Sequence, residues 1–376
     1  MAAVERTVCA APRTRPASGL TIREARRDDH AAVQTCMLEV FRETAGRKAP
    51  TFSAELWSWQ YVGGELGTVV VVAEESNQIC GYYHALLLKL RRFGEPVTAA
   101  MVQDVGTLRS HRGRGVFREM GSHAVELLRE RGVSLIYTFP NSRSLPSFVL
   151  NHRYQRVSRV PVYATPLDLA PWLSRRIPGG GVFGALGNGL VRLAGFGHVK
   201  RPDLGDGAKL MRLARFDESV EVLTEAWTDD QRLGLERSAS YLNWRFFDKP
   251  NQAYEVWGLS GGGKLRAYVV TCATTLSGAD CVLIADYGCR PGEEDWLARL
   301  TSARLAEERA AGKSLGLLMT LHALQPCFAR LSFTRVPERF NPRPFNLLCK
   351  DLATEADPRL LEKDRWLITL ADWDVF

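Results

Sequence analysis

The sequence has no long apolar run, no Cys-x-x-Cys pair and no apolar segment behind the basic residues at its N-terminus. The longest strongly apolar stretches, 68–73 and 82–88, are much shorter than the ~18 residues of a membrane-spanning helix. The eight cysteines are scattered, which is not the spacing of a zinc site or of a secreted disulfide framework. We therefore expect a cytoplasmic protein with no membrane span.

The charge balance is also weakly one-sided. Lys and Arg number 49 against 42 Asp and Glu, a net charge of +7 over 376 residues. Nucleic-acid-binding proteins concentrate a larger excess on one stripe, so no nucleic-acid partner is expected. The local excess at residues 109–118 suits a small phosphate-bearing ligand, and the histidine spacings predict no metal site.

The chain is long enough for two or three domains. Residues 1–18, rich in Ala, Arg, Pro and Thr, predict a disordered tail, with an organellar transit peptide as the alternative. A first domain is expected over 19–165 and a second over 208–376. The Pro- and Gly-rich residues 166–207 predict a linker, in which 182–194 form an amphipathic helix that docks on a domain or contacts another chain of a homo-oligomer.

Within the first domain, residues 21–25 predict a strand, followed by a helix with Asp28 or Asp29 as its N-cap. Three β-branched runs, at 68–73, 79–90 and 97–107, are separated by short turns and predict an antiparallel meander. A helix over 115–131, a buried strand over 134–139, a short helix over 145–150 and a strand over 154–163 complete the domain.

The second half repeats this order. Trp59 and Trp244 lie in similar aromatic segments, and each segment is followed by three strand runs, a helix and a buried strand; the second copy's helix is expected over 293–311 and its buried strand over 315–321. This predicts a duplicated α+β domain. A chance likeness of two Trp-rich segments is the alternative.

The residues that point to chemistry are Arg112-Gly113-Arg114-Gly115, between a strand and an amphipathic helix. A helix N-terminus offers unpaired N–H groups and a partial positive charge, and glycine lets the backbone approach an anion closely. The segment is neither a Walker A loop nor a dinucleotide fingerprint. It predicts a pyrophosphate cradle, with a solvated connection as the alternative.

This segment resembles the signature R/Q-x-x-G-x-G/A of the GNAT superfamily of acyl-CoA N-acyltransferases. Arg112 and Gly115 match its first two positions, and Phe117 departs from the small third residue. The Phe139-Pro140-Asn141 turn also resembles a GNAT subgroup. The resemblance covers 21–165 with the motif in full and 209–376 in the order of elements only.

The resemblance implies two GNAT-like domains, each a mixed, mostly antiparallel twisted sheet flanked by helices, and acetyl-CoA as acyl donor without a metal. The backbone of Val105 and Thr107 would hold the pantetheine arm, and Asn141 would bond that arm or neighbouring backbone. The pyrophosphate would receive N–H groups from Arg112, Gly113, Arg114, Gly115, Val116 and Phe117. The second domain opens its helix with acids at 293–295, which predicts that it binds no CoA.

By the same resemblance, the protein is expected to be an N-acetyltransferase that acts on a primary amine of a small molecule by direct attack. Members of that superfamily often carry a carboxylate on the fourth strand and a tyrosine on the helix after the fifth strand. The corresponding positions here fall on Gln103 and near Val149, which cannot serve as acid or base. Asp104 and the terminal carboxylate of Phe376 are the candidate bases, and 366–376 predict an ordered strand. The alternative is a catalytically inactive CoA-binding regulatory or assembly module.

Overall fold

The computed structural model describes residues 19–45, 53–174, 186, 202–205, 207–250, 253–322, 324–340 and 344–373. The predicted tail 1–18, the 182–194 helix apart from Leu186, and Phe376 lie outside these residues. Two compact units are present: unit 1 comprises 1–52, 69–84 and 104–127, and unit 2 comprises 53–68, 85–103 and 128–376. Two long strands of the first half run through both units.

The first half contains the predicted elements, with bounds shifted by a few residues. They are β1 (Leu20–Glu24), α1 (His30–Ala45), α2 (Ala54–Tyr61), β2 (Thr68–Glu75), β3 (Gln78–Arg92), β4 (Glu95–Thr107), α3 (Val116–Glu130), β5 (Val133–Thr138), α4 (Leu145–Leu150), β6 (Gln155–Val160), β7 (Val162–Pro166) and α5 (Ala170–Ser174). The single strand expected over 154–163 is wrong. Pro161 lacks an N–H donor and separates β6 from β7.

The second half follows the same order, except that α7 is shorter than α1 and that β9 comes before α8. It contains β8 (Ala208–Arg212), α7 (Glu221–Thr224), β9 (Leu233–Leu235), α8 (Ala239–Phe246), β10 (Tyr254–Gly261), β11 (Lys264–Leu276), β12 (Ala279–Cys289), α9 (Glu294–Ala310), β13 (Leu315–Met319), α10 (Gln325–Ala329), β14 (Thr334–Arg335), β15 (Phe345–Asp351) and β16 (Trp366–Leu367).

The strand expected over 366–376 is wrong for most of its described part. Only β16 is extended, and Leu370–Asp372 form a 3-10 helix. Thr369 starts this helix, because its Oγ1 accepts the Ala371 N–H and its own N–H donates to Asp372 Oδ2.

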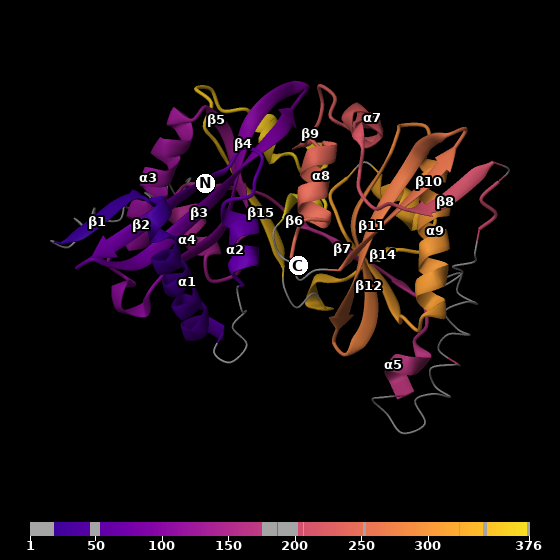
Figure 1. Cartoon of the computed structure of the whole chain (residues 1–376), viewed down its shortest axis with the longest axis horizontal. Helices are drawn as coiled ribbons and strands as arrows, with labels where there is room; N and C mark the ends of the chain where they lie inside the picture. The colour runs from indigo at the N-terminus through magenta and orange to yellow at the C-terminus, as the bar shows by residue number, and fades with distance from the viewer. Residues whose placement is uncertain are drawn as a thin grey trace, which may run out of the picture. The chain divides into compact units, whose positions relative to one another are not determined.

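The strands form two mixed sheets that confirm the predicted α+β class. The first has the order β1-β2-β3-β4-β5-β15-β6, and the second has the order β14-β7-β13-β12-β11-β10-β8. β4–β5 and β12–β13 are parallel, and most other pairs are antiparallel. β15 comes from the second half yet pairs with β5 and β6, and β7 comes from the first half yet pairs with β13 (Figure 1). The second half therefore supplies β15, β9 and β16 to the first sheet, and the first half supplies β7 to the second.

Helices α2 and α8 show the repeat in atomic detail. Ser53 and Ser238, which cap these helices, each accept an N–H from the residue three positions on. The Trp59 and Trp244 rings stack with centroids 4.6 Å apart. Trp59 Nε1 donates to Trp244 O at 2.8 Å, and Trp244 Nε1 donates to Trp59 O at 3.3 Å. Such a reciprocal contact is expected of a duplicated element.

His84 on β3 makes stability depend on pH. The side chain is fully buried, and burial lowers its pKa to about 3 because the charged imidazolium loses its solvation. A depressed folded pKa adds stability above the unfolded value of ~6.5, and this stability is lost as pH falls. Between about pH 7.5 and about pH 5, the free energy of unfolding of the wild type should fall by about 2 kcal/mol because of His84. In His84→Gln this fall should be about 2 kcal/mol smaller. Urea unfolding at both pH values measures this, and an unchanged acid loss in the variant would contradict it.

Candidate functional site

The connection from β4 to α3 in unit 1 is shaped for an anion. Gly113 and Gly115 have φ values of +78° and +81°, which L side chains rarely adopt. A Cβ placed on Gly113 would meet no atom within 4 Å. The first turn of α3 is closed by the Glu119 N–H to Gly115 O at 3.1 Å, so the amides just before Glu119 point out of the helix N-terminus. Such an end can hold a phosphate.

The side chains of this loop are bonded to the protein. Arg112 donates from Nε to Thr107 O at 2.9 Å and from Nη2 to Glu43 Oε2 at 2.7 Å. Arg114 forms an ion pair with Glu75, and the hydrogen bond from Arg114 is the largest cause of that carboxyl's lowered pKa. The guanidinium of Arg112 thus fixes the loop to β4 and α1. The groups left to meet an anion are the backbone amides.

The end of β4 extends beyond its pairing with β5. The parallel register runs from Thr98–Val133 to Val102–Thr138, whereas β4 continues to Thr107. Thr107 Oγ1 is buried and has no hydrogen-bond partner in the described part of the chain. An extended ligand that carries amides can pair with such a strand end.

Asn141 opens α4. Its Oδ1 accepts the N–H groups of Arg143 at 2.9 Å and Ser144 at 3.1 Å, and its carbonyl accepts the Leu145 N–H at 2.9 Å. These hydrogen bonds correspond to one of the two roles expected for Asn141, the bond to neighbouring backbone.

A small cavity in unit 2 adjoins Gln103, one of the two positions that the resemblance associates with catalysis. Its lining consists of Trp59, Gln60, Leu86, Met101, Gln103, Tyr241, Trp244, Arg245, Ala371 and Trp373. The walls are mainly aromatic, and the polar groups are amides, a phenol and one guanidinium. The two repeated Trp segments, which predicted a duplicated domain, supply part of this lining.

Arg245 holds the C-terminal segment at this cavity. The side chain is 2 % exposed, and its Nη2 donates to Leu370 O at 3.0 Å and to Trp373 O at 2.6 Å. Tyr241 Oη donates to Ala371 O at 2.6 Å. The position of 370–373 is therefore set by α8, and Phe376 lies outside the described residues.

Asp104 lies on β4 next to Gln103 in the sequence, and alternation along a strand turns the two side chains to opposite faces. In unit 1 the pKa of Tyr82 is raised well above its ordinary value by burial and then by the Asp104 charge. The second half has the matching pair, in which Tyr268 Oη donates to Asp286 Oδ2 at 2.8 Å. There the aspartate is fully buried and structural.

The start of α9 differs from the start of α3. Glu293 accepts a hydrogen bond from Arg266 Nη1 at 2.6 Å, and Glu294 Oε1 accepts the Gly292 N–H at 3.0 Å. Carboxylates thus already occupy this helix N-terminus and would repel a pyrophosphate.

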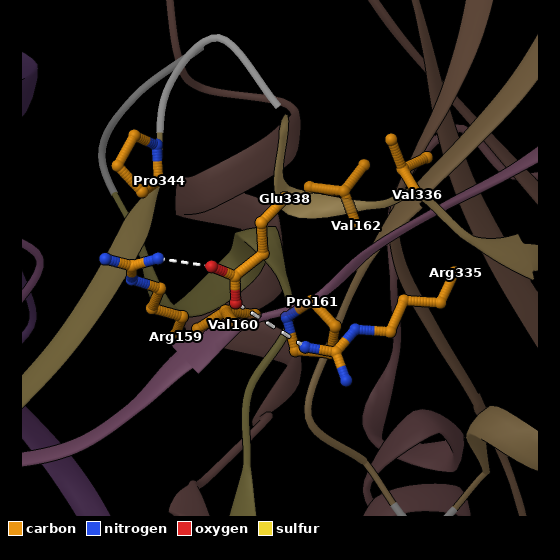
Figure 2. A pocket seen from close by; sticks show the side chains of 8 residues that line it. All are labelled: Arg159, Val160, Pro161, Val162, Arg335, Val336, Glu338 and Pro344. Carbon is orange, nitrogen blue, oxygen red and sulfur yellow. Dashed lines mark hydrogen bonds and ion pairs between the residues drawn. The ribbon is translucent and has the colours of Figure 1, made fainter. Parts of the chain in front are cut away.

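A further hollow lies where β6 passes into β7 at Pro161 (Figure 2). Its two arginines, Arg159 and Arg335, both form ion pairs with Glu338. All three side chains are more than half exposed, so the pairs contribute little to stability.

The described residues contain neither a metal cluster nor a membrane-spanning helix. No group of three or more His, Cys, Asp or Glu side chains in these ranges is arranged to hold a metal ion. None of the helices in the same ranges has the length and apolar character needed to cross a membrane.

Comparison with known proteins identifies one domain in the first half of the chain. Residues 21–148 match the family model of the acetyltransferase (GNAT) domain. None of the curated proteins compared matches the sequence.

Three solved structures share the fold. A probable N-acyltransferase from Enterococcus faecalis V583 has a TM-score of 0.62 at 12% identity, over 89% of this chain and 72% of that one. A tandem GNAT protein from the clavulanic acid biosynthesis pathway has a TM-score of 0.54 at 15% identity, over 90% of this chain and 100% of that one. Saccharomyces cerevisiae N-myristoyltransferase, solved with myristoyl-CoA and inhibitors, has a TM-score of 0.58 at 11% identity, over 91% of this chain and 82% of that one.

The family model covers the segment that holds the Arg112–Gly115 loop, and the fold likeness extends over both sheets. Residues 21–148 therefore contain an acetyltransferase domain of the GNAT type, and the chain as a whole shares the fold of a tandem GNAT protein.

Proposed function

We propose that the protein is an N-acetyltransferase that moves an acetyl group from acetyl-CoA to a primary amine of a small molecule. The observation that carries the proposal is the open N-terminus of α3 behind two glycines with positive φ. The match of this segment to the acetyltransferase (GNAT) domain supports it.

In this proposal the donor lies along the end of β4 and the α3 N-terminus. Backbone N–H groups of the segment from Arg112 to Phe117 bind the pyrophosphate, and Arg112 keeps the loop in place through Thr107 O. The backbone of Val105 and Thr107 pairs with the amides of the pantetheine arm. Asn141 orders the turn after β5.

Only the amine group of the acceptor is proposed to reach the cavity at Gln103, because its volume of about 10 Å³ is close to that of one water. Its aromatic walls suit such a group, since aromatic faces attract cations. The amine must lose its proton before it attacks the thioester carbonyl, and the thiolate then leaves and takes up a proton. Gln103 can orient the amine by hydrogen bonds but cannot take its proton.

The proposed bases are Asp104 and the α-carboxylate of Phe376. Asp104 would act through a water, because its side chain turns away from Gln103. Phe376 follows Trp373, a cavity residue, by three positions, and a chain of three residues spans at most about 10 Å.

We expect Gln103→Ala to lower kcat/KM for the amine about tenfold, the loss of about one positioning hydrogen bond, with little change in acetyl-CoA affinity. Steady-state kinetics and calorimetry on the same preparation measure both. Met101→Leu, on the same cavity wall, is the matched control and should keep near-wild-type kinetics. A Gln103→Ala enzyme with unchanged kcat/KM would contradict the acceptor assignment.

The test of the proposed function is thiol release from acetyl-CoA in the presence of a panel of amines. The panel includes amino sugars, aminoglycoside-like compounds, metabolite amines and a lysine peptide. Release with a small-molecule amine supports the proposal. The presence of Gln103 where a carboxylate is common favours the second candidate, a CoA-binding regulatory module, and tight acetyl-CoA binding without release from any amine would select it.

A further inference from the structure

The second half contains a larger hollow on the face of its sheet that α7 partly covers. Its volume is about 680 Å³, within the range of about 300–1,000 Å³ common for small-molecule sites. Lys209 and Met211 line it from β8, and Leu213 lines it just after that strand. Ala208 and Leu210 pack on the opposite face, against the core that includes α9.

A short helix leaves this face open. In the first half, α1 follows β1 and has 16 residues, and it buries Val33, Met37 and Val40. In the second half, α7 occupies the same place in the element order and has four residues. Apolar side chains consequently remain at the surface of the hollow: Met211, Leu213 and Leu265 are half-buried, and Val222 is 45 % exposed.

Three cations gather at one edge of the hollow. Lys209 pairs in register with Ser260, Lys264 pairs across the hairpin turn with the next residue, Gly261, and Arg290 follows the last residue of β12. Among the described residues, no carboxylate forms an ion pair with any of these three side chains. Their charges are therefore available to a ligand.

The other two charged residues of the hollow, Arg215 and Asp217, leave it with a net positive charge. Arg215 pairs with Asp248 at 2.9 Å. Asp217, the acid that lines the hollow, accepts the Ser219 N–H at 2.9 Å. The hollow thus combines an apolar floor with a net positive rim.

We propose that this hollow binds an amphipathic anion, a ligand with an apolar chain or ring and a carboxylate or phosphate head. The head would lie between Lys209, Lys264 and Arg290, and the apolar body would cover Met211, Leu213 and Leu265. This site is separate from the proposed acyl-donor site, because side chains of the second half bind the anion instead of a helix N-terminus.

The test is calorimetric titration with octanoate and octyl phosphate, which share the tail and differ in the head. Octanol and octyltrimethylammonium are the controls for the tail alone and for the opposite charge. We expect at least one anion to bind at least about tenfold more tightly than both controls, with an affinity that falls as salt is added. The preferred head identifies the ligand class.

The variant Lys209→Glu/Arg290→Glu reverses two rim charges and should weaken anion binding at least about tenfold. Lys363→Glu, an exposed charge outside the hollow, is the matched control and should bind as the wild type does. Leu213→Ser should weaken octanoate without changing the salt dependence. The proposal is overturned if neither anion exceeds the controls, or if the double variant, shown folded by circular dichroism, binds both anions as the wild type does.

Discussion

Substitution of Gly115 by glutamate is expected to abolish measurable acetyl-CoA binding. The residue has a φ of +81°, a conformation that costs a non-glycine residue about 1–2 kcal/mol. The new carboxylate would also lie beside the proposed pyrophosphate position, where like charges repel by several kcal/mol in a partly desolvated site. Together these effects predict a rise in Kd of at least about a thousandfold, measured by calorimetry on the folded variant.

Two companion variants separate charge from loop geometry. Arg112→Ala removes the bond to Thr107 O and the pair with Glu43 but leaves the backbone amides, so a loss of about 1–2 kcal/mol is expected. Glu293→Ala, at the N-terminus of α9, should leave acetyl-CoA affinity unchanged. Near-wild-type binding by Gly115→Glu would exclude this loop as the pyrophosphate site.

Replacement of Arg237 by methionine should destabilise unit 2 by about 3–5 kcal/mol, because it leaves two buried carboxylates without their cation. Arg237 is 5 % exposed. Its Nε lies 3.2 Å from Asp286 Oδ1, and its Nη2 lies 2.7 Å from Asp372 Oδ2. This cluster connects β12 to the C-terminal segment. Urea unfolding at neutral pH measures the loss.

The pH dependence of this loss separates charge from packing. Burial already raises the pKa of Asp372 above its ordinary value. A raised folded pKa means that stability is lost as pH rises through it, so the deficit of Arg237→Met should shrink as pH falls. The triple variant Arg237→Met/Asp286→Asn/Asp372→Asn should recover part of the stability. A deficit below about 1 kcal/mol, or one independent of pH, would contradict the role of the cluster.

Local patterns in the sequence are sufficient for most elements. The β-branched runs of β2, β3 and β4 alternate with short turns, and α3 combines an apolar stripe with a glycine-rich start. These signals act over a few residues, and the resulting bounds agree with the structure to within a few positions. The Arg112–Gly115 loop belongs to this class, because its chemistry depends only on a strand, two glycines and a helix that are adjacent in the chain.

Pairings between strands that are far apart in the sequence could not be predicted from local patterns. The place of β15 between β5 and β6 depends on residues about 200 positions apart, and a local pattern carries no record of the partner strand. The extended reading of 366–376 failed because Thr369 and Asp372 cap a 3-10 helix that Arg237 and Arg245 hold from other elements. The cavity at Gln103 was missed for the same reason, since its walls come from α2, β4, α8 and the C-terminal segment.

The stoichiometry of acetyl-CoA binding to the wild-type chain tests the central claim most directly. The claim is that the α3 N-terminus of the first half holds the acyl donor and that the acid-filled α9 N-terminus of the second half does not. Calorimetric titration should give one acetyl-CoA per chain, and Gly115→Glu should remove that site. Two sites per chain, no binding, or one site that survives in Gly115→Glu would contradict the account.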